Sequence, residues 1–167
     1  LADEIEYQSF LQFLFYRQWT ALKAYANERN VSIIGDLPIY VSPDSTEVWA
    51  HPELFLLDEE AHPTAVAGVP PDAFSTTGQH WGNPLYDWSA HRADGFAWWR
   101  QRGEHMARLY NVVRIDHFRA FHTYWSIPTE AQTAMEGHWE PGPGMELVEV
   151  LRAIPGLSLI AEDLGDL

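Results

Sequence analysis

The chain has 167 residues and a formal net charge of -14 at pH 7; 46% of its residues are hydrophobic and 20% are charged. This balance is typical of a globular domain with its own core and excludes a disordered chain. The negative charge argues against a nucleic-acid partner, the absence of any long apolar run argues against a membrane segment, and the absence of cysteine excludes disulfides and thiol chemistry.

The first third of the chain predicts a helix, a strand and a long irregular region, in that order. Apolar residues recur at helical spacing over residues 3–29, and Asn30 is a plausible stop. The next string, VSIIGDLPI, is β-branched and predicts a buried strand that ends at Gly35–Asp36 and is closed by Pro38. Residues 41–92 are rich in proline and glycine without sustained periodicity, so we expect a functional loop or a small inserted subdomain there.

The rest of the chain repeats the alternation of helix and strand. Residues 95–110 predict a second helix, VVRIDHF from residue 112 a second strand, 122–144 a loop, 144–154 a short helix, and 157–165 a third strand. Helices that alternate with short buried strands predict an α/β fold with a parallel sheet. The chain begins at Leu1 without a methionine, and we expect it to be a segment of a longer protein.

Each predicted strand becomes polar at its carboxyl end. Asp36 ends the first strand, Arg114 to Arg119 end the second, and Glu162–Asp163 end the third. In parallel α/β proteins the ligand site gathers at this end of the sheet. The sequence therefore predicts that these polar side chains surround a ligand.

Alternation along the second strand assigns its side chains to two faces. Residues two apart share a face, so Arg114, Asp116 and Phe118 should point one way, and Ile115 and His117 the other. A cation two residues before a carboxylate on one face stabilises the ionised form and lowers the pKa of Asp116. An ionised carboxylate suits a nucleophile or an electrostatic stabiliser.

Glu162 is expected to differ from Asp116. Its face is shared with Ile160 and Leu164, and Asp163 is adjacent. An apolar setting with a nearby carboxylate would raise the pKa of Glu162 and suit it to proton donation. One carboxyl group of low pKa and one of high pKa across a ligand is the pair that glycoside chemistry needs.

Structural explanations exist for each group taken alone. Arg114–Asp116 could be an ion pair, Glu162–Asp163 a helix cap, His117 a core histidine, and Asp36 part of a turn. Carboxylates at three successive strand ends favour a site instead. A metal site is disfavoured because the eight histidines show no H-x-x-x-H spacing, and there is no phosphate-binding glycine loop with lysine and no G-x-S-x-G motif.

Four strings together resemble one family: GDLPIYVSPDSTEVWAHPELF, AGVPPDAFSTTGQHWGNPLYDW, VVRIDHFRAFHTYWSIP and LIAEDLGDL. They resemble the amylomaltases, or disproportionating enzymes, the 4-alpha-glucanotransferases of glycoside hydrolase family 77. The resemblance implies that residues 1–167 are a partial catalytic (β/α)8 TIM barrel. Residues 1–30 would be a barrel helix, the three strands would be about strands 3–5, and residues 41–92 would be an insertion over the barrel mouth.

The resemblance also implies roles for individual residues. Asp116 matches the nucleophile that forms a covalent glucosyl intermediate, and Glu162 matches the general acid/base. Arg114 and His117 match residues that keep the nucleophile charged and contact the donor sugar, and Asp36 matches a binding aspartate on the donor side. Four further positions fall on a mobile loop over the acceptor groove, where the two aromatic ones would stack on glucose: Asp72, Phe74, Gln79 and Trp81.

The implied activity is transfer of alpha-1,4-glucan segments to an acceptor with retained configuration, without cofactor or metal. The implied partners are malto-oligosaccharides, maltodextrin, starch or glycogen chains, with neither nucleic acid nor membrane, and we expect a cytoplasmic enzyme. Ala73 stands where many members have tyrosine, and Ala120 where glycine is usual. The family's third catalytic carboxylate, in a later His-Asp motif, is absent, so we expect residues 1–167 alone to be inactive and marginally folded. An amylase-type alpha-glucan hydrolase, a non-catalytic glucan-binding module and a purely structural domain remain alternatives.

Overall fold

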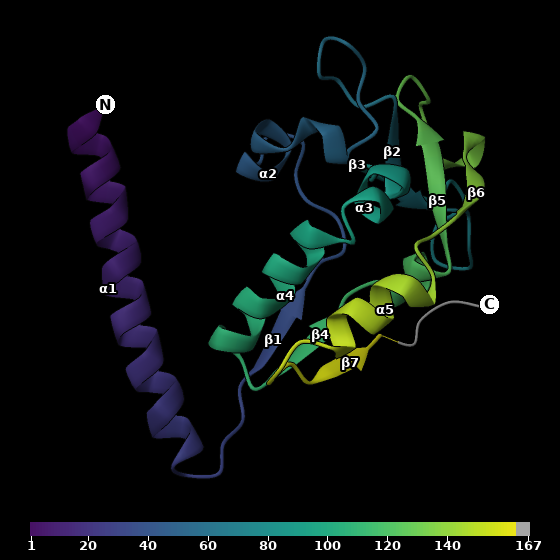
Figure 1. The fold of residues 1–167 in the computed structure, drawn as a ribbon. Helices are drawn as coiled ribbons and strands as arrows, with labels where there is room; N and C mark the ends of the chain where they lie inside the picture. Colours follow the sequence, from purple (N-terminus) through teal and green to yellow (C-terminus); the bar gives the residue numbers. More distant parts are fainter. Residues whose placement is uncertain (163–167) are drawn as a thin grey trace.

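Three short parallel strands form the predicted sheet in the computed structural model of the protein, which describes residues 1–162 (Figure 1). The strands are β1 (Ile34–Leu37), β4 (Val112–Ile115) and β7 (Leu159–Ala161), with β4 in the centre. Their residues alternate between two faces: Leu37 and Ile115 are buried, whereas Ile34 and Ile160 are 60% and 45% exposed. The described part of the chain therefore covers only one face of this sheet.

Helices α4 (Ala97–Leu109) and α5 (Met145–Arg152) belong to the covered side and confirm two predicted helices. They approach each other closely at Gly103. A Cβ atom at this position would lie 2.5 Å from Ile154 Cδ1 and 3.1 Å from Leu151 Cδ2. A glycine within a helix costs about 1 kcal/mol relative to alanine. At this position it allows α4 and α5 to pack closely, because a Cβ atom would collide with the facing side chains.

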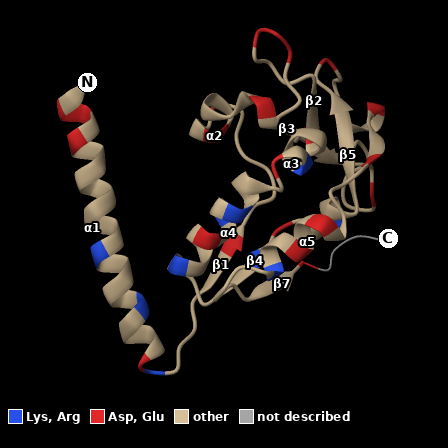
Figure 2. Cartoon of the chain, in the orientation of Figure 1, with Lys and Arg blue, Asp and Glu red and all other residues tan. Residues whose placement is uncertain are grey.

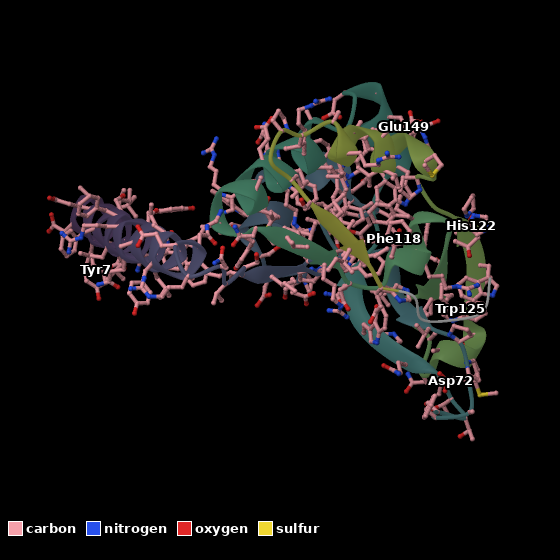
Figure 3. All side chains as sticks on the ribbon, turned by 90° about the horizontal axis from the view of Figure 1, so that it is seen from below. Tyr7, Asp72, Phe118, His122, Trp125 and Glu149 are labelled. Atoms are coloured by element: carbon pink, nitrogen blue, oxygen red, sulfur yellow. The ribbon has the colours of Figure 1, made fainter. Side chains whose placement is uncertain are left out.

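Helix α1 (Ala2–Asn27) confirms the first predicted helix but stands apart from the other elements (Figure 1). Its second half is tied to the end of α4. Trp19 Nε1 donates to Leu109 O at 2.8 Å, and Lys23 Nζ donates to Tyr110 O at 2.9 Å. The described part of the chain buries none of its residues, and Figure 3 shows Tyr7 far from both sheets.

A second sheet of four antiparallel strands lies beside the first. It contains β2 (Ala65–Val69), β3 (Gln79–Pro84), β5 (Thr123–Pro128) and β6 (His138–Pro141), in the order β3-β2-β5-β6. The prediction of a loop over residues 122–144 is wrong, because this region holds β5, the 3-10 turn η3 (Ala134–Glu136) and β6. The backbone of β5 pairs with β2, distant in sequence, on one side and with β6 on the other.

A cluster of aromatic rings joins the two sheets beneath α2 (Thr46–Ala50), η1 (Pro52–Leu54) and α3 (Trp88–Ala93). Tyr86 is buried at its centre, with ring centroids at 5.0 Å from Trp88, 5.2 Å from Phe55 and 5.4 Å from Trp99. Such pairs stabilise a core beyond the area they bury.

Among residues 1–162, no helix combines the length and apolar composition needed to cross a membrane.

Candidate active site

Charged residues are spread over the elements and are mostly acidic (Figure 2), so charge alone does not mark a site. Convergence does: three carboxylates meet one guanidinium at the carboxyl ends of the parallel strands. Arg114 Nη1 lies 2.6 Å from Asp36 Oδ1, and Arg114 Nη2 lies 2.7 Å from both Asp116 Oδ1 and Glu162 Oε1. The side chains at the strand ends therefore converge as predicted. We call Asp36, Asp116 and Glu162 the carboxylate cluster.

Strand register explains why these side chains meet. Asp36 pairs with Arg114, and Arg114 pairs with Ile160, two residues before Glu162, so all lie on one face. The register continues past the strand ends: Asp116 N–H donates to Leu37 O at 3.1 Å, and Glu162 N–H donates to Ile115 O at 3.2 Å. Backbone bonds from both neighbouring strands therefore fix the cluster. Asp163 and Leu164, also named in the sequence prediction, lie outside the described residues.

The two predicted catalytic carboxyl groups lie close together. Asp116 Oδ1 and Glu162 Oε1 are each 2.7 Å from the same nitrogen, so they are separated by at most twice that distance. Retaining glycosidases hold their carboxyl groups roughly 5–5.5 Å apart, whereas inverting ones use roughly 6.5–9.5 Å. For these two oxygens the geometry admits the retaining range and excludes the inverting range.

The expected raised pKa of Glu162 is not observed. Burial alone would raise the pKa, but the hydrogen bond from His117 N–H at 2.6 Å and the bond from Arg114 outweigh it, so the pKa lies below its ordinary value. The same contact to Glu162, and then that to Asp36, raises the pKa of Arg114. The pKa of Glu162 is lowered because the His117 amide and then Arg114 reach it from the end of the neighbouring strand.

His117 links the carboxylate cluster to the second sheet. Its backbone is left-handed, with φ 51°, which turns its amide toward Glu162. Its ring lies edge to face with Trp81 at 5.0 Å, and Trp81 Nε1 donates to Gln79 Oε1 at 3.0 Å. Burial lowers the pKa of His117, although Glu162 and Asp116 oppose this, so a neutral imidazole is favoured near neutral pH. The edge strand β3 thus brings two predicted binding residues beside the cluster.

The left-handed turn at His117 also ends the alternation assumed for the second strand. Phe118 begins the 3-10 turn η2 (Phe118–Phe121) and does not share the face of Arg114 and Asp116. It lines an apolar cavity of about 360 Å³ with Ile115, Leu159 and Ala161, on the helix side of the sheet. The expectation that Phe118 points with Asp116 is therefore wrong.

The other two predicted loop residues lie away from the carboxylate cluster. Asp72 Oδ1 accepts the amides of Phe74 and Ser75 at 2.8 Å and 2.7 Å, which closes a tight turn. The side chain of Phe74 is almost fully solvent-exposed, at 97%. Figure 3 shows Asp72 at the end of the molecule opposite Tyr7. The binding roles of these two residues stay predictions.

Sequence reasoning missed Tyr40. Its ring is stacked on Tyr86 at 6.0 Å and tilted toward Trp81 at 6.3 Å, so it supports the wall of the site that Trp81 forms. The signal in the sequence that could have identified Tyr40 is its position directly after Pro38–Ile39, which close the strand.

In the part of the chain that the structure describes, no three His, Asp or Glu side chains are grouped as metal ligands would be.

Comparison with known proteins gives a consistent result over the whole chain. The family profile of glycoside hydrolase family 77, described as 4-alpha-glucanotransferase, matches residues 1–167. A 4-alpha-glucanotransferase of Thermus thermophilus is 54% identical over 99% of this chain and 33% of its own length. The chloroplastic/amyloplastic 4-alpha-glucanotransferase of Solanum tuberosum is 50% identical over 92% of this chain and 27% of its own. The solved amylomaltase of Streptococcus agalactiae, in complex with acarbose, superposes with a TM-score of 0.95 at 49% identity, covering all of this chain and 34% of that one.

Proposed function

Because this chain belongs to the 4-alpha-glucanotransferase family, glycoside hydrolase family 77, we propose that it carries the main catalytic carboxylates of an enzyme that transfers alpha-1,4-glucan segments between malto-oligosaccharides. The observation that carries the proposal is the pair Asp116 and Glu162, held at one nitrogen of Arg114. The chain spans about a third of the length of the curated relatives it matches. We therefore assign the activity to the complete protein and expect residues 1–167 alone to be inactive.

We propose that the parallel sheet is part of a (β/α)8 barrel, in which β1, β4 and β7 are about strands 3–5. One observation supports this beyond the similarity to amylomaltases. Parallel sheets are normally covered on both faces, yet here Ile34 and Ile160 are exposed on the face that carries the carboxylate cluster. In a closed barrel this face would point into the packed interior, with the cluster at its mouth. Residues 41–92 would lie over that mouth.

In the proposed reaction, Glu162 protonates the glycosidic oxygen while Asp116 attacks the anomeric carbon. The leaving glucan departs with the proton, and a covalent glucosyl ester of Asp116 remains. The acceptor then attacks the ester with a hydroxyl oxygen deprotonated by Glu162, which frees Asp116 and retains the anomeric configuration. The short distance between the two carboxyl groups supports the retaining route.

The ion pair between Arg114 and Glu162 belongs to the resting state in this proposal. A general acid must hold a proton, and the contact with Arg114 favours the ionised form. Glu162 must therefore exchange Arg114 for the glycosidic oxygen when substrate enters. Arg114 would keep Asp36 and Asp116 as partners, which holds the nucleophile in position.

Substrate contacts are proposed on both sheets. Asp36, Arg114 and His117 would bind the donor sugar, and Gln79 and Trp81 would line the acceptor side, with Asp72 and Phe74 on a loop that covers it. Closure of such a loop excludes water and favours transfer over hydrolysis. Proposed partners are malto-oligosaccharides, maltodextrin, starch or glycogen chains, without cofactor, metal, nucleic acid or membrane. A reducing compartment such as the cytoplasm suits a chain without cysteine.

The test is incubation of the complete open reading frame containing these residues with maltotriose, followed by separation of products by size. Glucose together with maltopentaose and longer chains is the expected result. Glucose and maltose alone would replace transfer by hydrolysis. Binding of maltotriose without any product would indicate a non-catalytic glucan-binding protein.

A further inference from the structure

The segment that follows β1 is held by side chains from outside it. Residues 38–41 form neither helix nor strand in the described structure, yet Ile39 and Tyr40 are buried. No helix or strand ladder supplies donors to the backbone carbonyls of this segment, and three of them accept side-chain donors instead. Arg102 Nη2 donates to Pro38 O at 2.7 Å, Tyr86 Oη to Ile39 O at 2.6 Å, and Asn83 Nδ2 to Val41 O at 2.9 Å.

The three donors come from different parts of the fold. Arg102 lies on α4, Asn83 on β3, and Tyr86 just after β3, in the aromatic core. The Arg102 guanidinium lies 5.2 Å and 5.3 Å from the ring centres of Trp98 and Trp99. Within residues 1–162 its hydrogen bonds go to backbone carbonyls and not to a carboxylate. A half-buried cation is thus bound to a short irregular segment, although no carboxylate among the described residues pairs with it.

Each end of this segment touches the candidate active site. At the β1 end, Leu37 O, next to Pro38, accepts the amide of Asp116 at 3.1 Å. At the other end, the ring of Tyr40 packs against Trp81, whose ring meets His117. One end therefore supports the carboxylate cluster and the other supports the aromatic wall.

We propose that Arg102, Tyr86 and Asn83 are positioning residues that set Asp116 and Trp81 through the carbonyls of residues 38–41. We call this arrangement the carbonyl clamp. The proposal rests on the proposed glucan transfer for its kinetic consequences. Arg102 bonds chiefly to Pro38 O, at 2.7 Å against 3.5 Å to Ile39 O, beside the backbone bond of the nucleophile, and controls the rate of chemistry. Tyr86 bonds to Ile39 O at 2.6 Å and Asn83 to Val41 O at 2.9 Å, on either side of Tyr40, and these two residues control binding of glucan.

The experiment compares three variants of the complete protein in maltotriose transfer. Arg102→Lys keeps the charge but loses the planar fork that reaches two carbonyls, and should lower kcat about tenfold with KM within threefold. Tyr86→Phe keeps the packed ring and Asn83→Ala removes only an amide, and each should raise KM about five- to tenfold with kcat within twofold. The distinguishing result is that kcat changes in one variant and KM in the other two. A general loss of stability would not produce this division, because it would lower the amount of active enzyme in all three variants.

The control is Thr129→Val, which removes another side-chain bond to a carbonyl, from Thr129 Oγ1 to Pro63 O at 2.5 Å, away from residues 38–41. It should leave both parameters within twofold of the unaltered protein. The proposal fails if the clamp variants match Thr129→Val, or if both ends change the same parameter. Should Arg102→Lys not fold, the KM effect of the other two variants still decides.

Calorimetric titration with maltotriose separates this proposal from the proposed function. If the unaltered protein binds but does not transfer, glucan transfer is refuted, and a five- to tenfold weaker Kd in Tyr86→Phe and Asn83→Ala still supports the clamp. Unchanged Kd values in those variants, or no binding by the unaltered protein, would overturn the clamp.

Discussion

The two sheets contribute different chemistry to one site. The parallel sheet brings charged groups together: Asp36, Arg114 and Glu162 come from three neighbouring strands and are fixed by register. The antiparallel sheet brings neutral and aromatic contacts, with Gln79 and Trp81 on its edge strand β3. The proposed chemistry and the proposed sugar contacts are thus placed on separate sheets, and kinetic experiments on the complete protein should separate them.

The largest effect should come from Asp116→Asn in the parallel sheet. Removal of the proposed nucleophile should lower kcat for maltotriose transfer by about 10³-fold or more, while binding of maltotriose changes only a few-fold. Asp3→Asn, on the exposed start of α1, serves as the matched control and should have no effect. Retention of a tenth of the activity by Asp116→Asn would remove Asp116 from the mechanism.

Arg114→Met should have the next largest effect. Loss of the shared guanidinium leaves three neighbouring carboxylates without the cation that joins them, so kcat/KM should fall about 100-fold. The pKa of Glu162 should rise because Arg114 lowers it, and the alkaline limb of kcat/KM against pH should move to higher pH. Arg92→Met, which breaks the exposed 2.7 Å pair with Glu146, is the control. An unmoved alkaline limb would refute the ion-pair account of Glu162.

Trp81→Ala tests the antiparallel sheet. It should raise KM roughly tenfold with little change in kcat, because a stacked aromatic face contributes on the order of 1 kcal/mol. Trp139→Ala is a matched control: it lies on β6, at the opposite edge, and is 41% exposed against 38% for Trp81. Equal effects of the two variants would contradict the assignment of the site to the β3 edge.

Acid should weaken the fold through buried histidine. His91 is 0% exposed, and burial lowers its pKa, so the folded state favours the neutral ring. Its contribution to stability is complete above the ordinary histidine pKa and is lost as pH falls toward the lowered one. The pKa of His117 is also lowered, so His117 acts over the same range, whereas the lowered pKa of the Glu162 carboxyl matters only at more acidic pH. The melting temperature should therefore fall between pH 7.5 and pH 5.

His91→Phe should reduce that fall in melting temperature, because the phenyl ring has no charged form to exclude. His122→Phe, at an exposed position, should keep the full pH dependence. Identical pH dependence in both variants would show that His91 is not responsible.

The smallest effect should come from Ala120→Gly, which restores the residue usual in the family. Ala120 is fully buried in η2, so loss of its methyl group should cost about 1 kcal/mol of unfolding free energy. Activity should stay within twofold, since no hydrogen bond joins Ala120 to the carboxylate cluster among the described residues. Chemical denaturation measures the free energy of unfolding, and maltotriose transfer measures the activity. A larger loss of activity would link η2 to catalysis.

Local patterns in the sequence were enough for the parallel half of the fold. Helical spacing predicted α1, α4 and α5, and β-branched runs with polar ends predicted β1, β4 and β7. The four-stranded sheet was harder to predict, because β5 pairs with β2, which is far away in sequence, and β6 joins the sheet only through β5. Turn residues around Gly137 and Pro141 therefore suggested loop where two strands exist.

The candidate site shows the same limit. Polar strand ends predicted that Asp36, Arg114, Asp116 and Glu162 would meet. Alternation within one strand could not reveal that Arg114 also binds Glu162, because this contact depends on register between strands. It also could not reveal the left-handed turn at His117, which moves Phe118 to the other face.

One cation shared by three carboxylates has a consequence for inhibitors. When all three are ionised, the cluster keeps an excess of two negative charges at the place where the sugar ring would sit. Such a field attracts a ring that carries positive charge, as the oxocarbenium-like transition state does, more than a neutral glucose. An iminosugar protonated at its ring nitrogen should bind more tightly than the corresponding neutral sugar, and its advantage should shrink as salt screens the field.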